Sequence, residues 1–540
     1  MFLDSLNRDW ISPYGNERVE TRNLQALADR GVVFDHHYLC SGACMPARCE
    51  LFSGRAGQFL WRAWGPVEPF DRLLPLEARR LGAVTALVTD HYHYWEFPAH
   101  GFHEGYDCTR LIRGHEYDAA STEPVGDPST WPAWVHAYLK WRPENAGNPR
   151  YYRNVMHLRG EEDFHGPRVM REACDWLDAN HSHEKFFLHV ESFDPHEPWH
   201  VPEPYRSMYG PYDENYTCWP PYQNKKQAEK FLKEASEEEI QFARNQYAGK
   251  VTMVDRWLGR LWDKMDQYDL WEDTLVIVTT DHGHSLADRS RPAPHFGKSH
   301  PIFEDVARIP LLIYHPGVEG GRRVGSTFSN VTDVRATILH ALGARERGSV
   351  MVDGVSLLPV LEGKTKSVRD YAVYGEFGTG VGLSTPEANY VRGYDPKKPL
   401  YNYTCELPIM LSATFVTLAT RAFGFSVPFK VAEAFLNRVA KKVTSGHFVP
   451  GVKLPQWRVP VPKLLASRFV AWGPKKKDYL FDRRRDPELK ENLAGAPEGR
   501  ELERKMVNLL KRALREMGTP QELFERFRLD ASPEEAANEQ

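Results

Sequence analysis

The chain has 540 residues, of which 41% are hydrophobic and 26% are charged, and its formal net charge is −4 at pH 7. A chain this long can bury a core large enough to fold without disulfides or structural metals. Its balanced charge argues against a nucleic-acid partner. Its seven cysteines are odd in number and few, which disfavours a secreted disulfide framework and favours a reducing compartment. Charged residues follow Met1 almost at once, so the sequence predicts no signal peptide and a cytoplasmic location.

Strand-like and helix-like segments alternate along the first 370 residues. The apolar, strand-like segments are 31–38, 81–90, 185–194, 273–283 and 309–317. Helical periodicity lies between them, in Glu20–Arg30, Arg168–Asn180, Glu237–Tyr268 and Asp333–Leu342. Continuous apolar strands separated by helices predict an α/β fold, with a large, mostly parallel sheet flanked by helices on both faces.

Four aspartates stand at the ends of strand-like segments. Asp4 follows the stub Met1–Leu3, and Asp90, Asp194 and Asp281 close three later strands. Each alone is an ordinary cap or turn residue. Together they indicate one crevice, because ligands in such sheets bind at the carboxyl ends of the strands.

Three cysteines fall within ten residues, in "CSGACMPARCELFSGR". The spacing of Cys40, Cys44 and Cys49 matches neither paired zinc-ribbon cysteines nor the common iron–sulfur runs. His36 and His37 lie nearby, so a zinc site stays open as one alternative, and three buried structural thiols are the plainest one. No local signature of a cysteine protease accompanies the cluster.

The residues after Cys44 predict a helix that begins at this cysteine. Pro46 suits a first helical turn, where its missing N–H costs nothing. The free N–H groups and the dipole of a helix N-terminus favour an anion, and Arg48 lies one turn further on. The sequence therefore predicts an anion pocket at Cys44.

A second group of polar residues follows the strand 273–283. Asp281 and His282 end this strand, and oxygen donors with one imidazole suit a divalent cation. Asp4, from the first strand, is a third candidate ligand. Lys298, after "HFG", offers a cation that could hold an anionic oxygen.

Histidines follow two further strands. His91 and His93 come after 81–90 and either line a substrate pocket or pack among the neighbouring aromatic residues. His196 lies between prolines in "FDPHEPW" and is either a general acid or a surface-turn residue.

The regular alternation of strand-like and helix-like segments ends at about residue 370. We predict that 371–540 forms a smaller α+β subdomain with an insertion at about 380–470. The apolar stretch 407–429 is interrupted before it could span a membrane, so it is either a core helix or a contact in a homo-oligomer. A closing helix carries one apolar face, formed by Met506, Leu509, Leu510 and Leu514.

Several motifs in order resemble one family. "CMPAR" followed by "CELFSGR" is similar to the sulfatase signature, Cys-x-Pro-x-Arg with a downstream Ser/Thr-Gly. "FDPHEPW", "TTDHGH" and "GKSHPIFEDVARIPLLI" resemble later landmarks of that family, and "YLFDRRRDPELKENLA" resembles its C-terminal subdomain. The likeness covers most of 1–370 and 478–515. It implies the alkaline-phosphatase-like fold, with a catalytic domain at 1–370 and an antiparallel sheet plus helix in 371–540.

The resemblance also implies a catalytic apparatus. In the family the signature cysteine, here Cys44, is oxidised by a maturation enzyme to formylglycine, whose hydrated aldehyde attacks sulfur. A divalent metal would bind Asp4, Cys44, Asp281 and His282, with calcium expected first and manganese, magnesium or zinc as alternatives. Arg48 would orient the formylglycine.

The same resemblance assigns residues to the substrate, a small-molecule or saccharide sulfate ester. Lys298 and His196 would grip the ester and protonate the leaving oxygen, and His91 and His93 would line the pocket. An inactive binding protein on this fold is disfavoured because the principal ligands are all present.

Some positions depart from the family pattern. Ser5 replaces a second aspartate, and His284 stands where relatives often have glutamate. The pair Asp281–His282 replaces Asp-Asn and is shared with phosphonate monoester and phosphodiester hydrolases of the superfamily. The sequence therefore leaves such a hydrolase as the alternative to a sulfatase.

Overall fold

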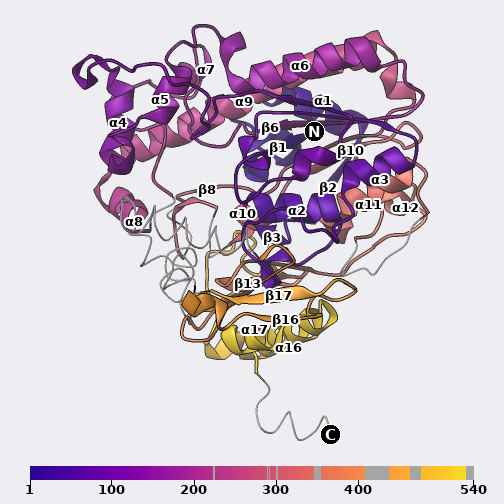
Figure 1. Cartoon of the computed structure of the whole chain (residues 1–540). Helices are drawn as coiled ribbons and strands as arrows, with labels where there is room; N and C mark the ends of the chain where they lie inside the picture. The colour runs from indigo at the N-terminus through magenta and orange to yellow at the C-terminus, as the bar shows by residue number, and fades with distance from the viewer. Residues whose placement is uncertain are drawn as a thin grey trace, which may run out of the picture.

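An eight-stranded mixed sheet forms the upper part of the molecule in Figure 1, a computed structural model. The structure describes residues 1–222, 225–288, 290, 292–298, 302–345, 354–407, 437–461 and 476–530. Nearly all of the apolar stretch 407–429 lies outside these residues, so its two interpretations stay predictions. In spatial order the strands are β11 (Arg322–Asn330), β2 (Val32–Tyr38), β10 (Leu311–Tyr314), β7 (Val276–Thr279), β1 (Phe2–Leu3), β6 (Phe186–Ser192), β4 (Val84–Thr89) and β5 (Cys108–Leu111).

The sheet is parallel except at one strand. Strand β10 pairs antiparallel with both β2 and β7, whereas the other neighbouring pairs are parallel. The five strand-like segments found in the sequence correspond to β2, β4, β6, β7 and β10. The predicted mixed, mostly parallel sheet is therefore confirmed.

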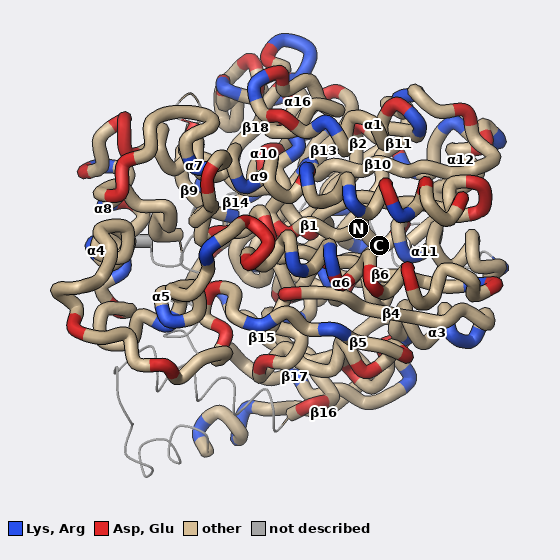
Figure 2. The backbone as a smooth tube through the Cα atoms, turned by 90° about the horizontal axis from the view of Figure 1, so that it is seen from above, with Lys and Arg blue, Asp and Glu red and all other residues tan. Residues whose placement is uncertain are grey.

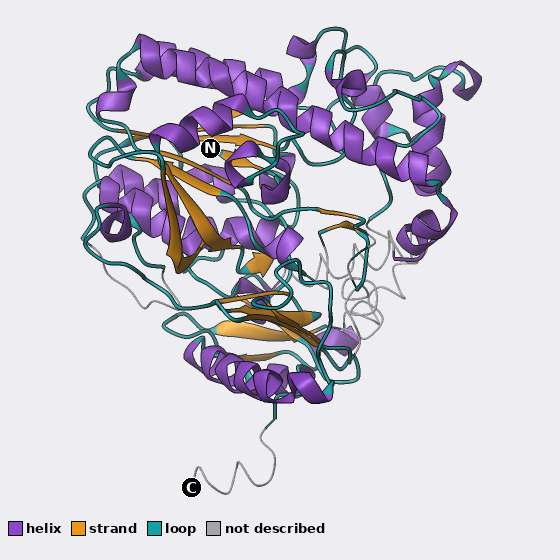
Figure 3. Ribbon diagram, turned by 180° about the vertical axis from the view of Figure 1, so that it is seen from behind, coloured by secondary structure: helices purple, strands orange, loops and turns teal. Residues whose placement is uncertain are grey.

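Helices cover both faces of this sheet (Figures 1 and 3). One layer comprises α1 (Arg22–Arg30), α6 (His165–Asn180) and α9 (Glu237–Gln267). The other comprises α2 (Met45–Ser53), α3 (Leu74–Arg80), α11 (Val331–Ala341) and α12 (Leu358–Leu361). The predicted helices correspond to α1, α6, α9 and α11 within a few residues of each end.

Further short helices and strands lie in the segments that connect these elements along the chain. They are α4 (Ala133–Trp141), α5 (Arg150–Val155), α7 (Tyr205–Met208), α8 (Lys225–Glu234), α10 (Glu304–Ala307), β8 (Ser285–Leu286) and β9 (Phe296–Gly297).

The two-residue strand β1 lies in the middle of the sheet, between β7 and β6. Side chains alternate along a strand, so Phe2 packs with the core on the α2 face and Leu3 packs with the core on the α9 face. The backbone N–H of Asp4 donates to the carbonyl oxygen of Ser192 at 3.0 Å. Short as it is, β1 is fixed on both faces, and Asp4 leaves it in a defined direction.

A second, smaller sheet lies below the first (Figure 1). Strands β12 to β14 and β18 pair antiparallel with one another, and β3 joins β12 in parallel. Helix α16 packs on this sheet through Met506, Leu510 and Leu514, as its apolar face predicts. The order is β18 (Tyr479–Asp482), β14 (Ala388–Gly393), β13 (Gly380–Ser384), β12 (Ala372–Glu376) and β3 (Ser41–Gly42), and α16 spans Arg500–Glu516.

Part of the predicted insertion forms a three-stranded antiparallel sheet. Its order is β15 (Tyr401–Thr404), β17 (Gln456–Pro460) and β16 (Thr444–Gly446), and the short helix α17 (Gln521–Arg526) lies nearby. The boundary at residue 370 stays a prediction, since β3 from the first part of the chain belongs to the lower sheet.

Basic and acidic residues alternate around the molecule. In Figure 2 blue and red segments intermingle over the described chain, in keeping with the near-balance of charge in the sequence. Among the described residues, no helix combines the length and apolar character needed to cross a bilayer.

Candidate active site

The ends of four neighbouring strands place the four aspartates along one edge of the large sheet. Strands β7, β1, β6 and β4 are consecutive neighbours. Asp281, Asp4, Asp194 and Asp90 follow them in that same order. This order brings residues that are up to 277 positions apart in the chain to one edge of the sheet.

Cys44 stands at the N-cap of α2. Its backbone has φ 52° and ψ −103°, and Pro46 occupies the first turn as the sequence predicts. The carbonyl oxygen of Cys44 accepts the first helical hydrogen bond, from the N–H of Arg48 at 3.1 Å. All nine residues of α2 are buried, so the helix holds Cys44 rigidly at its N-terminus.

Asp4, Cys44, Asp281 and His282 form one cluster. One ligand atom from each residue lies within 4.8 Å of the others, and all four side chains are buried. The Nδ1 of His282 bonds the carbonyl oxygen of Gly283 at 2.8 Å, which leaves the lone pair of Nε2 facing the cluster. That Nε2 lies 3.2 Å from the Cys44 Sγ and 3.2 Å from Asp281 Oδ2.

The electrostatics of the cluster suit a cation. Burial and the neighbouring Asp281 raise the pKa of Asp4 to about 7. Burial acts the same way on Asp281, but His282 and Arg48 outweigh it and hold the pKa of Asp281 below its usual range. Burial keeps the pKa of His282 at about 4, so its imidazole is neutral and able to coordinate. Two buried carboxylates and a neutral imidazole fit a hard or borderline divalent ion.

Ser5 occupies the position where the family resemblance predicts a second aspartate. Its hydroxyl donates to Asp4 Oδ1 at 2.8 Å, and its backbone N–H donates to Asp281 Oδ1 at 3.2 Å. Ser5 thus orients two carboxylates of the cluster while adding no negative charge of its own.

Arg48 reaches the cluster from one turn inside α2. Its Nη2 donates to Asp4 Oδ2 at 2.7 Å, and its Nη1 donates to Asp281 Oδ2 at 2.5 Å. Its Nε donates to Glu191 Oε1 at 2.7 Å. Glu191 is not among the site residues predicted from the sequence. It lies within the apolar run of β6 and carries no motif signal beyond being an acid in a buried strand.

Lys298 and His196 form a second pair of contacting, buried side chains. The Lys298 ammonium donates to His196 Nε2, while His196 Nδ1 bonds the carbonyl oxygen of Glu197 at 2.5 Å. Burial and the neighbouring lysine hold the pKa of His196 far below its usual value. Although burial opposes it, nearby groups that include Glu197 and Asp4 raise the pKa of Lys298. The proton of this pair therefore resides on the lysine.

Glu197 is a second residue of this region that is not among those predicted from the sequence. Its carboxylate is buried, lies 3.7 Å from Lys298 Nζ, and is 3.5 Å from both His196 Nδ1 and His284 Nδ1. Its position between two prolines, directly after His196, is the sequence feature that could have identified it as a site residue.

The two histidines after β4 have different surroundings. His91 is fully buried, and its Nε2 lies 3.6 Å from Asp4 Oδ2. His93 lies further out, with Nδ1 2.6 Å from Glu96 Oε2 and its ring centroid 5.2 Å from that of His91. Only His91 directly approaches the cluster.

Asp90 and Asp194 lie on the same edge but have other partners. Asp90 accepts a hydrogen bond from the N–H of Phe193 at 2.6 Å. Asp194 contacts Lys250 Nζ at 2.6 Å and His115 Nε2 at 3.0 Å. Two of the four strand-end aspartates therefore belong to the candidate metal cluster, and two support the loops around it.

The other two cysteines of the opening motif are outside the cluster. Cys40 Sγ accepts from the N–H of Gly57 at 3.2 Å, and Cys49 Sγ accepts from Arg62 at 3.3 Å. Both thiols are buried and free, as expected for structural cysteines.

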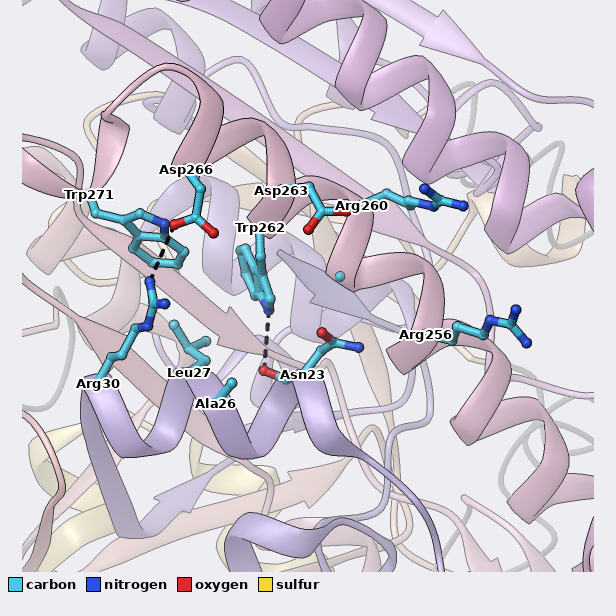
Figure 4. A pocket seen from close by; sticks show the side chains of 11 residues that line it. Asn23, Ala26, Leu27, Arg30, Arg256, Arg260, Trp262, Asp263, Asp266 and Trp271 are labelled. Atoms are coloured by element: carbon cyan, nitrogen blue, oxygen red, sulfur yellow. Dashed lines mark hydrogen bonds and ion pairs between the residues drawn. The ribbon is translucent and has the colours of Figure 1, made fainter.

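A surface groove of about 370 Å³ between α1 and α9 lies apart from these residues (Figure 4). Several of its polar groups are already paired. Arg30 lies 3.5 Å from Asp266 and over the Trp271 ring, and the Trp262 Nε1 donates to the carbonyl oxygen of Asn23 at 3.2 Å. The groove holds none of the chemistry-bearing residues described above.

Comparisons with known proteins agree with this geometry. A model of the sulfatase family matches residues 1–344. An arylsulfatase of Clostridium perfringens is 26% identical over 402 residues, which cover 70% of this chain and 81% of that protein. A choline-sulfatase of Rhizobium meliloti is 24% identical over 420 residues, which cover 72% and 77%.

Solved structures share the fold. A phosphonate monoester hydrolase of Agrobacterium radiobacter superposes with a TM-score of 0.62 at 19% sequence identity, and the match covers 96% of this chain and 95% of that one. This likeness confirms the predicted alkaline-phosphatase-like architecture of a large mixed sheet with a smaller antiparallel one.

Proposed function

Because the chain belongs to the sulfatase family and is a sulfuric ester hydrolase, we propose that it cleaves sulfate esters at the cluster around Cys44. The observation that carries this proposal is the convergence of Asp4, Cys44, Asp281 and His282 within 4.8 Å. The substrates we propose are small-molecule or saccharide sulfate esters.

Cys44 acts in an oxidised form rather than as a thiolate. Burial raises the pKa of the Cys44 thiol well above its usual value, and neighbouring carboxylates add to this effect, so the thiol stays protonated at neutral pH. Once a maturation enzyme has converted Cys44 to formylglycine, the hydrated aldehyde supplies a hydroxyl nucleophile. The N-terminus of α2 offers N–H groups and a positive dipole end for the anionic sulfuryl group.

Asp4, Asp281 and His282, with the group at Cys44, would hold a divalent metal, calcium before manganese, magnesium or zinc. Such an ion supplies Lewis-acid stabilisation of negative charge. Arg48 keeps the carboxylates of Asp4 and Asp281 aligned through its paired hydrogen bonds.

The chain's own proton donor is Lys298. Its pKa is raised and that of His196 is depressed, so Lys298 carries the proton toward the leaving oxygen and His196 fixes the direction of the ammonium. His91, beside Asp4, and His93, further out, line the entrance.

A phosphonate monoester or phosphodiester hydrolase is the second candidate. What favours it is the pair Asp281–His282, which resembles the pair of such hydrolases. Turnover of an aryl sulfate and of the matching aryl phosphonate ester, measured on one preparation, separates the candidates. We expect higher kcat/KM for the sulfate, and a clear preference for the phosphonate would reverse the assignment.

The oxidised form of Cys44 is tested by mass spectrometry. We expect the peptide carrying Cys44, from protein produced together with a maturation enzyme, to have the mass of the aldehyde or its hydrate. A Cys44→Ala variant should lose turnover by several orders of magnitude while its urea unfolding midpoint stays close to that of the parent. A fully active protein with an intact thiol would refute this part of the proposal.

The metal assignment has a readout independent of turnover. We expect calorimetry of the metal-stripped protein to detect one Ca²⁺ per chain, and Asp281→Asn to weaken this binding at least tenfold by removing a buried ligand charge. Asp288→Asn, an acid outside the cluster, serves as the matched control. Equal calcium affinity in both variants would place the ion elsewhere.

A further inference from the structure

A continuous row of aromatic rings leads outward from the candidate metal cluster. His91 is fully buried, and its Nε2 lies 3.6 Å from Asp4 Oδ2. The His93 ring follows at 5.2 Å between centroids, and the Trp64 ring follows that of His93 at 5.0 Å. Exposure rises along this row, from 0% for His91 to 12% for the His93 side chain and 37% for Trp64. The row therefore runs from the reacting centre to solvent.

The loops that carry these rings are fixed in place. The N–H of Val67 donates to the carbonyl oxygen of His100 at 3.2 Å, which joins the Trp64 loop to the loop after β4. Arg62 donates to the carbonyl oxygen of Pro66 at 2.8 Å and closes the Trp64 loop on itself. Trp64 is thus a half-exposed ring on an ordered support, the form in which an aromatic surface binds with little loss of entropy.

The polarity of the side chains changes along the row. Near the cluster the groups are charged, with Lys298 over the Tyr222 ring at 5.0 Å. At the outer end His93 already bonds Glu96, and Trp64 offers an apolar face. An ester whose sulfate lies at Cys44 would meet charge at its sulfuryl end and a flat apolar surface at its leaving group.

We propose that Trp64 is a specificity-determining residue that stacks on the ring of the leaving group. The substrate class is then a sulfate ester of a cyclic alcohol, either a phenol or a pyranose, rather than of a short acyclic alcohol. This inference rests on the proposed function, because it takes the sulfate to bind at Cys44.

The test compares ligands with and without a ring. Dissociation constants of phenyl sulfate, a glucosamine 6-sulfate and ethyl sulfate are measured by calorimetry on the full-length Cys44→Ala protein, so that nothing is turned over. In this background we expect Trp64→Ala to weaken at least one ring ligand about tenfold and ethyl sulfate less than twofold. Trp64→Phe should retain most of the affinity, and the ring ligand affected separates a phenol from a pyranose.

Trp457→Ala is the matched control, since Trp457 is 38% exposed on the separate sheet formed by β15, β17 and β16. Unchanged affinity for both ring ligands in Trp64→Ala would overturn the inference, as would an equal loss for all three ligands or for Trp457→Ala. If the unsubstituted enzyme turns over no sulfate ester while ring binding still depends on Trp64, the proposed reaction fails and the ring-binding role stands.

Discussion

Glu197 is a buried carboxylate whose neighbours, Lys298 and His284, favour its ionised form. Burial alone would raise the pKa of its carboxyl, but Lys298 and His284 outweigh burial and lower it. The ionised carboxylate in turn helps to raise the pKa of Lys298. The charged or titratable groups that influence Lys298 also include Cys44 and Asp4.

Removing this charge should change the alkaline limb of the pH profile. In Glu197→Gln the pKa of Lys298 falls, so the protonated form needed for the leaving oxygen is lost at a lower pH. We expect the upper apparent pKa of kcat/KM to decrease, with the acid limb moved less. Glu203→Gln, whose side chain is 47% exposed, is the control and should leave the profile unchanged. A profile of unaltered shape in Glu197→Gln would show that this carboxylate does not tune Lys298.

Helix α16 packs on the lower sheet through one face, and we expect that face to contribute most of what the helix adds to the free energy of unfolding. Leu510 is fully buried in the core shared with the lower sheet, whereas Leu509 is only partly buried against the same core. Neighbouring residues of one type on one helix therefore differ mainly in burial.

The pair gives a matched test of this packing. Leu510→Ala should lower the free energy of unfolding by about 2–5 kcal/mol, because it opens a cavity in a close-packed core. Leu509→Ala should cost less than about 1 kcal/mol. Urea unfolding followed by tryptophan fluorescence measures both. Similar losses for the two variants would mean that α16 does not pack on the lower sheet through this face.

The sequence predicts the strands and helices of this fold better than it predicts every residue around the candidate site. Apolar runs ending in polar residues located β4, β6 and β7 correctly, because a buried parallel strand must be apolar on both faces. The sequence also predicted Cys44 at a helix start, since Pro46 favours the first turn. Glu191 and Trp64 could not be found in this way, because each contacts a partner distant in sequence that only the folded chain brings near.

At the scale of the whole molecule, a buried charge cluster joins the two sheets. Glu304 of α10 pairs with Arg483, which follows β18, at 2.6 Å, and it also accepts from the Tyr38 hydroxyl at 3.0 Å. Burial opposes ionisation of Glu304, but Arg483 and Arg308 prevail and lower its pKa to about 2.

This carboxylate should make stability depend on pH in the acid range. A pKa lowered from 4.5 to about 2 in the folded state contributes stability that is fully present above pH 4.5 and is lost as the pH falls toward 2. The contribution is on the order of 3 kcal/mol. Glu304→Gln should unfold more readily at neutral pH and should lose less stability than the parent over that acid interval.

The measurement is the urea midpoint across this pH range. Glu387→Gln, a surface acid that is 56% exposed, is the control and should follow the parent at every pH. An acid-induced loss in Glu304→Gln as steep as in the parent would assign the pH dependence to other carboxylates.

The parallel pairing of β3 with β12 joins a strand made early in synthesis to one made much later. Ser41 and Gly42 lie just before Cys44, yet their strand partners are Gly375 and Glu376, which the ribosome makes much later. The lower sheet, which includes the strand just before Cys44, therefore cannot be complete until Gly375 and Glu376 have been synthesised. In the finished fold the same side chain is only 4% exposed. We therefore expect an enzyme that modifies this cysteine to act before this fold is complete.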